Sequence, residues 1–248
     1  AAAAFSLLTV LLSVFLLPES LTAQRREALR AQAAGPARSN WQLLRLPSLA
    51  LLLFIIFGVN LGFFAFQSTY VLWLERLALP EQPETVVQQA VGALLTAVGL
   101  FGIAAQTWLV GPLIRRFGEK HLAIFGNLAR GAAFGVMAFF PSLMAAIVAV
   151  PLISVGGGVA LPALIALLTF TAPPADRGRV IGLNQSAAAL GNIFGPLLAG
   201  FLFDNVHPNA AMWAAGLVSL GTIAAGLALG FYRLPVMRPP APAGSPGR

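Results

Sequence analysis

The chain has no cysteine, only two histidines, and charged side chains at just 9% of its 248 positions. The absence of cysteine excludes disulfides, thiolate metal sites and cysteine nucleophiles. His121 and His207 lie far apart in the sequence, so neither a histidine metal site nor a bound cofactor is indicated. A soluble domain usually carries about 25% charged residues. So few charges exclude an ordinary soluble enzyme.

Apolar residues are correspondingly abundant. They make up 58% of the chain, and the mean hydropathy is +0.84. A membrane-spanning helix needs about 20 mostly apolar residues. Such runs predict an all-α, polytopic membrane protein with segments at about 1–17, 47–74, 89–111, 121–141, 143–170, 180–203 and 210–232.

The segments divide the chain into four regions. Residues 1–17 form a short run with no basic residue before it, and we interpret them as the end of a transmembrane helix from a preceding bundle. The chain is therefore expected to be a fragment. We interpret residues 18–46 as a basic linker and residues 47–234 as a bundle of six transmembrane helices. Residues 235–248 are rich in Pro and Gly, and we expect them to form a disordered tail.

The positive charges predict the orientation in the membrane. Of the fifteen Lys and Arg residues, one, Arg76, falls on the side that carries Glu75, Glu81, Glu84 and Asp204, and Arg130 lies inside a segment. The other thirteen fall on the opposite side: Arg25, Arg26, Arg30, Arg38, Arg45, Arg115, Arg116, Lys120, Arg177, Arg179, Arg233, Arg238 and Arg248. Positive loops face the cytoplasm, so the linker and the C-terminus are predicted to be cytoplasmic. The net charge of +7 then reflects topology and contact with the lipid bilayer, and no nucleic-acid partner is expected.

Several short motifs follow one another in a characteristic order. FLLPES at 15–20 precedes the basic linker, GPLIRRFGEK occupies 111–120, and Asp176-Arg177-Gly178 follows the fifth segment. Together with the glycines of the sixth segment, this order resembles the C-terminal half of a major facilitator superfamily transporter, from the end of helix six through helix twelve. The most similar branch is that of drug:proton antiporters, including tetracycline-type efflux proteins.

The resemblance implies a secondary transporter of the bacterial inner membrane, not an enzyme. It would export small amphiphilic molecules or drugs by alternating access, coupled to protons. Its partners would be the small-molecule substrate, protons, and an N-terminal six-helix bundle of the same protein or a second copy of this chain. No membrane-embedded Asp or Glu occurs here, so a proton-carrying carboxylate would have to come from the missing half.

The motif at 111–120 resembles a cytoplasmic turn of the family. It departs from the family pattern, because Arg115 stands where the family has aspartate and Glu119 where it has a basic residue. Gly111 and Gly118 are expected to permit a tight turn, and Arg116 to pair with helix carbonyls or an acidic group. The resemblance implies a gating role for the set Gly111, Arg115, Arg116, Gly118, Asp176, Arg177 and Gly178. The alternative is that the basic residues only set topology and meet anionic lipid headgroups.

The sixth segment carries Gly191, Gly195, Pro196 and Gly200. Gly191 and Gly195, four residues apart, share one helix face and would allow a close approach of another backbone. Pro196 removes a backbone hydrogen bond and is expected to bend the helix. These four residues are predicted helix-packing positions, with a hinge as the weaker hypothesis.

Substrate contacts are predicted on the second segment, where Asn60, Phe64, Gln67 and Tyr70 share roughly one helical face. Such a mixture of amides, a ring and a phenol suits a bulky amphiphile, although interhelical hydrogen bonds and core packing would explain it too. Arg130 is the fifth candidate, because a central arginine must face protein or water. It would serve either an anionic substrate or a coupling carboxylate, or else satisfy backbone carbonyls.

Three alternatives stay open at this point. The first is a sugar or metabolite carrier of the same superfamily, although the mixture of aromatic and amide side chains favours amphiphiles. The second is a membrane scaffold or accessory subunit that keeps the fold without transport, and the third is a half-size protein that dimerises.

Overall fold

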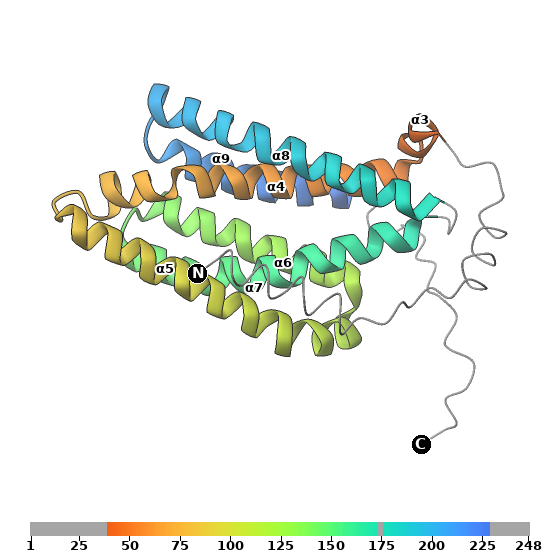
Figure 1. The fold of residues 1–248 in the computed structure, drawn as a ribbon, viewed down its shortest axis with the longest axis horizontal. Coiled ribbons are helices and arrows are strands. Elements are labelled where there is room, and N and C mark those ends of the chain that lie inside the picture. Colours follow the sequence, from red (N-terminus) through yellow and green to blue (C-terminus); the bar gives the residue numbers. More distant parts are fainter. Residues whose placement is uncertain (1–38, 173–175, 229–248) are drawn as a thin grey trace, which may run out of the picture. The chain divides into compact units, whose positions relative to one another are not determined.

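The computed structural model of the chain describes residues 39–172 and 176–228, which lie in the second of two units, Arg38–Arg248. These residues form helices and no β-strand (Figure 1), which confirms the all-α prediction. In chain order the helices are α3 (Asn40–Leu44), α4 (Pro47–Trp73), η1 (Leu74–Ala78), α5 (Glu84–Ala104), η2 (Ala105–Leu109), α6 (Val110–Phe139), α7 (Leu143–Thr171), α8 (Arg177–Asn205) and α9 (Ala210–Ala228). The predicted segment 1–17, most of the linker 18–46, and the tail 235–248 lie outside the described residues.

Five helical stretches in the described residues are long and apolar enough to cross a membrane. The longest, Glu84–Phe139, has 56 residues. A straight helix of that length would extend about 84 Å, nearly three times the thickness of a bilayer core. It is not straight, because Gly118 has non-helical angles of φ 75° and ψ 163°. The chain runs out along α5 and returns along α6 (Figure 1), so the stretch makes two passes and the described residues make six.

The helix ends follow local signals. Pro47 stands at the start of α4, where its missing N–H costs nothing. Ser142 caps α7 by accepting a hydrogen bond from the Ala145 amide at 3.2 Å. Helix α5 begins at Glu84, five residues before the predicted start of its apolar run, and Gln88 Nε2 donates to Glu84 Oε1 at 2.8 Å within this polar first turn. Apolar runs predict only the part of a helix that meets hydrocarbon.

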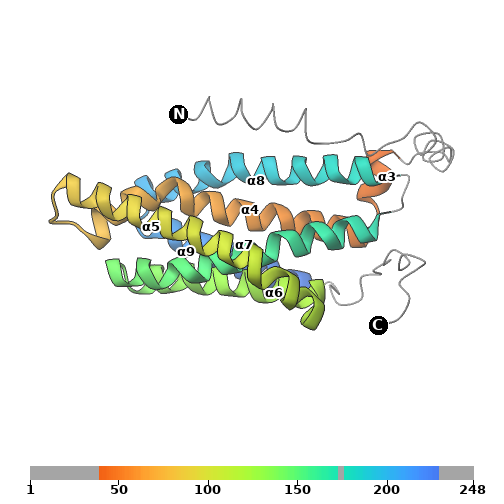
Figure 2. The same cartoon turned by 60° about the horizontal axis from the view of Figure 1, so that its bottom comes forward.

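The helices pack as a bundle in which α4 and α7 are the most enclosed. Helix α4 packs mainly against α8 and α9, while α6 packs mainly against α7 and α9. Helix α5 lies on α7, and α8 lies beyond α4 on the opposite side (Figure 2). Two apolar clusters fill the bundle. One gathers near α3 around Leu52, Leu164 and Leu167, and the other lies toward the far ends of the helices around Trp73 and Phe134.

The two ends of the bundle differ in charge. Figure 1 shows α3, the reversal between α5 and α6, and the start of α8 at one end. That end carries Arg45, Arg115, Arg116, Lys120, Arg177 and Arg179, with Glu119 and Asp176. The opposite end carries Glu75, Arg76, Glu81, Glu84 and Asp204. The fold therefore sorts the described charges as the sequence predicts.

Candidate functional site

Arg130 is the charged residue farthest from either end of the bundle. It lies ten residues after Lys120 and nine before Phe139, which at 1.5 Å per residue places it about 15 Å from one end of its pass and about 14 Å from the other. Its side chain is only 2% exposed. An arginine at the centre of a bilayer costs at least about 2.5–3.5 kcal/mol. Its environment must therefore compensate the charge or use it.

The guanidinium of Arg130 has few partners among the described residues. Nη2 donates to the carbonyl oxygen of Val59 on α4 at 3.5 Å, which is long for a hydrogen bond. The guanidinium carbon lies 4.8 Å from the centroid of the Phe63 ring, within the range of a cation–π contact. Nε is buried without a hydrogen-bond partner. Because an arginine offers five N–H donors, much of its binding capacity is unused.

Glycines of α7 make room for the arginine stem. A Cβ atom on Gly156 would lie 2.9 Å from Arg130 Cγ and 2.5 Å from the carbonyl oxygen of Gly126, so larger side chains would push α6 and α7 apart. A Cβ atom on Gly157 would lie 3.7 Å from the Cδ of Arg130. These glycines were not among the predicted site residues. The signal that could have found them is the run Gly156–Gly158 within an apolar helix.

Arg130 lines a cavity of about 300 Å³ whose walls come from α4, α5, η2, α6 and α7. Its other lining residues include Phe63, Val98, Gln106, Ser154 and Gly158. A second cavity of about 140 Å³ adjoins it, sharing Phe63, Val98 and Ile153. None of the described residues that line either cavity is acidic. The combined space suits a small ligand with an apolar body.

The predicted face of α4 is divided between two environments. Gln67 and Tyr70 line the smaller cavity. Asn60 and Phe64 instead lie where α8 crosses α4, and the Asn60 Cβ would be 2.7 Å from a Cβ atom on Gly191. Within the described residues the four side chains therefore do not all line one cavity. The four side chains spread over about 120° of the helix, wide enough to meet two neighbouring helices.

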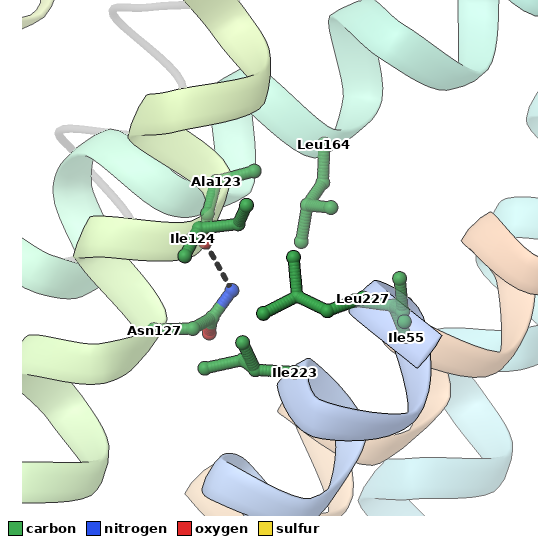
Figure 3. A pocket seen from close by; sticks show the side chains of 8 residues that line it. Ile55, Ala123, Ile124, Asn127, Leu164, Ile223 and Leu227 are labelled. Carbon is green, nitrogen blue, oxygen red and sulfur yellow. Dashed lines mark hydrogen bonds between the residues drawn. The ribbon is translucent and has the colours of Figure 1, made fainter. Parts of the chain in front are cut away.

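Asn127, one turn before Arg130, faces elsewhere. Its Nδ2 donates to the carbonyl oxygen of Ala123 at 2.8 Å, and it lines a small apolar cavity of about 10 Å³ together with Ile55, Leu164 and Ile223 (Figure 3). This space lies between α4, α6, α7 and α9 and is at the lower limit for a single water. Asn127 thus does not share the cavity of Arg130.

Comparison with known protein families shows to which family this chain belongs. Residues 83–248, about two thirds of the chain, match the model described as Major Facilitator Superfamily. The chain belongs to the major facilitator superfamily. It is 32% identical over 200 residues to tetracycline resistance protein, class D, of Salmonella ordonez, covering 79% of this chain and 47% of that protein. It is 30% identical over 215 residues to multidrug resistance protein 2 of Bacillus subtilis, covering 83% of this chain and 50% of the relative.

A third relative is tetracycline resistance protein, class C, of Escherichia coli. It is 28% identical over 213 residues, which are 86% of this chain and 51% of that protein. This major facilitator chain therefore spans about half the length of the curated relatives that it matches. The similarity to these tetracycline and multidrug resistance proteins confirms the predicted resemblance to the drug efflux branch.

The reversal in this major facilitator chain depends on one of its two predicted turn glycines. Gly118 has φ +75°, a backbone conformation that L side chains rarely adopt. Gly111 is instead helical, in the first turn of α6, so its predicted place in the turn is wrong. Arg115 and Arg116 are exposed, and the Arg116 guanidinium carbon lies 5.5 Å from the centroid of the Phe117 ring.

The second predicted cytoplasmic motif stands at the start of α8. Asp176 is 3% exposed and occupies the N-cap position, although its carboxylate makes no capping hydrogen bond. Arg177 and Gly178 are exposed in the first helical turn. The motif thus combines a buried carboxylate with an exposed basic residue.

The predicted packing glycines of α8 differ from one another. Gly191 and Gly195 are buried against α4, where a Cβ atom on Gly195 would lie 2.7 Å from the Leu61 carbonyl oxygen. In the part of the chain that the structure describes, a Cβ atom on Gly200 would meet nothing within 4 Å, so Gly200 does not share the contact of Gly191 and Gly195 with α4. Helical geometry explains this, because Gly200 lies five residues after Gly195 and points about 140° away. Pro196 lies inside α8 without ending it.

One buried contact was not predicted at all. Trp73 Nε1 donates to Asn209 Oδ1 at 2.9 Å, and Asn209 Nδ2 donates to the carbonyl oxygen of Ala138. These bonds join α4, the end of α6 and the residue before α9. The partners Trp73 and Asn209 lie 136 positions apart in the sequence, so no local pattern could reveal them.

Proposed function

We propose that this chain is the C-terminal bundle of a secondary transporter that exports small amphiphilic molecules or drugs across the inner membrane of a bacterium. The basic end of the bundle, with Gly118 and Asp176, faces the cytoplasm in this proposal, as the positive-inside rule predicts. The protein moves its substrate without converting it, so it is not an enzyme. The names of similar proteins, tetracycline resistance protein and multidrug resistance protein, support this substrate class.

The observation that carries the proposal is the pair of adjoining cavities at mid-membrane. Their walls are largely apolar, and Gln67, Tyr70, Gln106 and Arg130 add a few polar groups. That composition is typical of sites for amphiphilic small molecules. Secondary transporters bind substrate near the bilayer midplane, between two bundles that rock against each other. Arg130 lies at that depth.

Proton exchange drives the export in this proposal. The described acidic residues lie at the ends of the helices, and none lines either cavity. We therefore assign the proton-carrying carboxylate to the partner bundle, an N-terminal six-helix bundle or a second copy. Arg115, Arg116, Gly118, Asp176, Arg177 and Gly178 would form the contacts at the cytoplasmic end that open and close during transport.

The experiment blocks the larger cavity with a side chain that the backbone tolerates. Gly102 lines this cavity, and a Cβ atom there would meet nothing within 4 Å. In inverted membrane vesicles that contain the natural protein, gradient-driven uptake of neutral, cationic and anionic fluorescent amphiphiles is measured. Gly102→Phe should lower uptake of the transported probes at least about tenfold, an effect of about 1.4 kcal/mol.

The matched control is Gly99→Phe on the same helix. Gly99 also faces open space but lines neither cavity. This variant should retain uptake close to that of the natural protein. Equal uptake by the two variants would refute the cavity as the transport site. Absence of gradient-dependent uptake for every probe, together with copurification of a partner protein, would favour the scaffold alternative.

A further inference from the structure

We infer that Arg130 binds an anionic group of the transported molecule, so that the preferred substrates are amphiphiles bearing a carboxylate or sulfonate. The inference rests on the proposed function and specifies its substrate. It starts from an arginine that is 2% exposed, lines a cavity of about 300 Å³, and leaves Nε without a partner in the described residues.

The surroundings hold the guanidinium in one place. Gly156 and Gly157 contact the stem of Arg130, and the ring of Phe63 lies 4.8 Å from the guanidinium carbon. Its one hydrogen bond within the described residues, to the Val59 carbonyl oxygen, is 3.5 Å long and leaves most donors available. A fixed planar fork of N–H donors matches the two oxygens of a carboxylate. The site is therefore preorganised for an anion.

The cavity wall supplies the second part of the recognition. Arg130 is the one charged residue among the described residues that line the cavity, and Phe63, Val98, Ile153 and Leu161 belong to its apolar wall. An apolar body fits against these side chains while the anionic group reaches the guanidinium. Charges attract more strongly away from bulk water, so the arginine discriminates between charged and neutral ligands of equal shape.

A carboxylate elsewhere in the whole protein is the other source of the same chemistry. Within the described residues the acidic side chains lie at the helix ends, and none of them lines the cavity of Arg130. A carboxylate from the partner bundle would neutralise Arg130 for every substrate alike. An anionic substrate would do so only when it is bound. The two sources therefore predict different substrate dependence.

The experiment uses pairs of aryl-alkanoic acids and their primary amides, such as 1-naphthaleneacetic acid and 1-naphthaleneacetamide. Binding to the purified natural protein in detergent is measured at pH 7 by thermal stabilisation, and flux is measured separately in inverted vesicles. For at least one pair the acid should bind about tenfold or more tightly than the amide. Arg130→Gln should reduce this ratio to about one, because it removes the charge and keeps a similar length.

Three further variants make the test specific. Arg130→Lys keeps the charge without the planar fork and should retain part of the preference. Gln106→Glu adds a carboxylate to the same cavity at an exposed position, and should lower the acid-to-amide ratio even if Arg130→Gln fails to fold. Arg76→Gln makes the same chemical change at an exposed arginine outside both cavities, and should leave the ratio unchanged.

Equal binding of acid and amide for every pair would overturn the inference. So would an unchanged ratio in both Arg130→Gln and Gln106→Glu. An equal loss of acid and amide flux in Arg130→Gln, with no preference lost, would assign the arginine to a carboxylate within the protein. Because binding is measured apart from flux, a protein that prefers acids but moves no probe would contradict only the proposed transport.

Discussion

The close contact between α8 and α4 gives the sharpest prediction of stability. A Cβ atom on Gly195 would lie 2.7 Å from the Leu61 carbonyl oxygen and 2.9 Å from the Ala65 amide nitrogen. The shorter of these is 0.7 Å below the 3.4 Å at which ordinary contacts begin. Both neighbours are backbone atoms of a helix and cannot rotate away. Gly195→Ala must therefore separate the two helices or bend one of them.

Overpacking of this kind costs about 1–3 kcal/mol. Alanine also favours a helix over glycine by about 1 kcal/mol, which would partly hide the loss. Gly200→Ala removes that ambiguity, because Gly200 lies in the same helix and faces open space. Both variants gain the same helix propensity. The difference between them should therefore equal the packing cost, with Gly195→Ala less stable by about 1–3 kcal/mol.

The assay is unfolding of the purified natural protein in mixed micelles as the denaturing detergent is increased. Equal unfolding midpoints for the two alanine variants would refute the close contact. A lower midpoint for Gly200→Ala would do the same, since it would place the tight contact on the other face of α8.

Two further predictions concern buried and turn residues. The hydrogen bond between Trp73 and Asn209 should give a coupling free energy of about 0.6–1.7 kcal/mol in a double-mutant cycle of Trp73→Phe and Asn209→Ala, measured in the same unfolding assay. A coupling of zero would show that the two side chains do not interact. Gly118→Ala should cost about 1–3 kcal/mol because φ is +75° and ψ is 163°, a backbone region essentially limited to glycine, whereas Gly111→Ala should cost nothing because Gly111 is helical. Equal unfolding midpoints for these two variants would place the reversal elsewhere.

The sequence predicts the spans because the bilayer imposes a length on apolar helices. It also places Gly118 near a turn, although two glycines of one motif, Gly111 and Gly118, could not be told apart from the letters alone. Only the backbone shows that α6 already includes Gly111 and that the reversal comes seven residues later. Helix ends beyond the hydrocarbon, such as Glu84, are likewise set by polar contacts that an apolar run does not record.

The site is predicted less completely, because it depends on which helices become neighbours. Periodicity places Asn60, Phe64, Gln67 and Tyr70 on one side of α4, but only packing shows that α8 covers the first two. Arg130 stands out by charge alone. Its relation to Phe63 on α4 needs the three-dimensional structure, since the two residues come from separate helices.

The most direct test of the central claim is substrate protection of a cysteine in the larger cavity. This chain has no cysteine, so a single one can be introduced at Gly102 in a protein whose other cysteines, if any, are replaced. Labelling by a charged, water-soluble maleimide is followed with and without a transported amphiphile, and Glu84→Cys at the exposed start of α5 is the control. The proposed transport site predicts that substrate slows labelling at position 102 and leaves position 84 unchanged. Equal labelling rates at position 102 with and without substrate would contradict it.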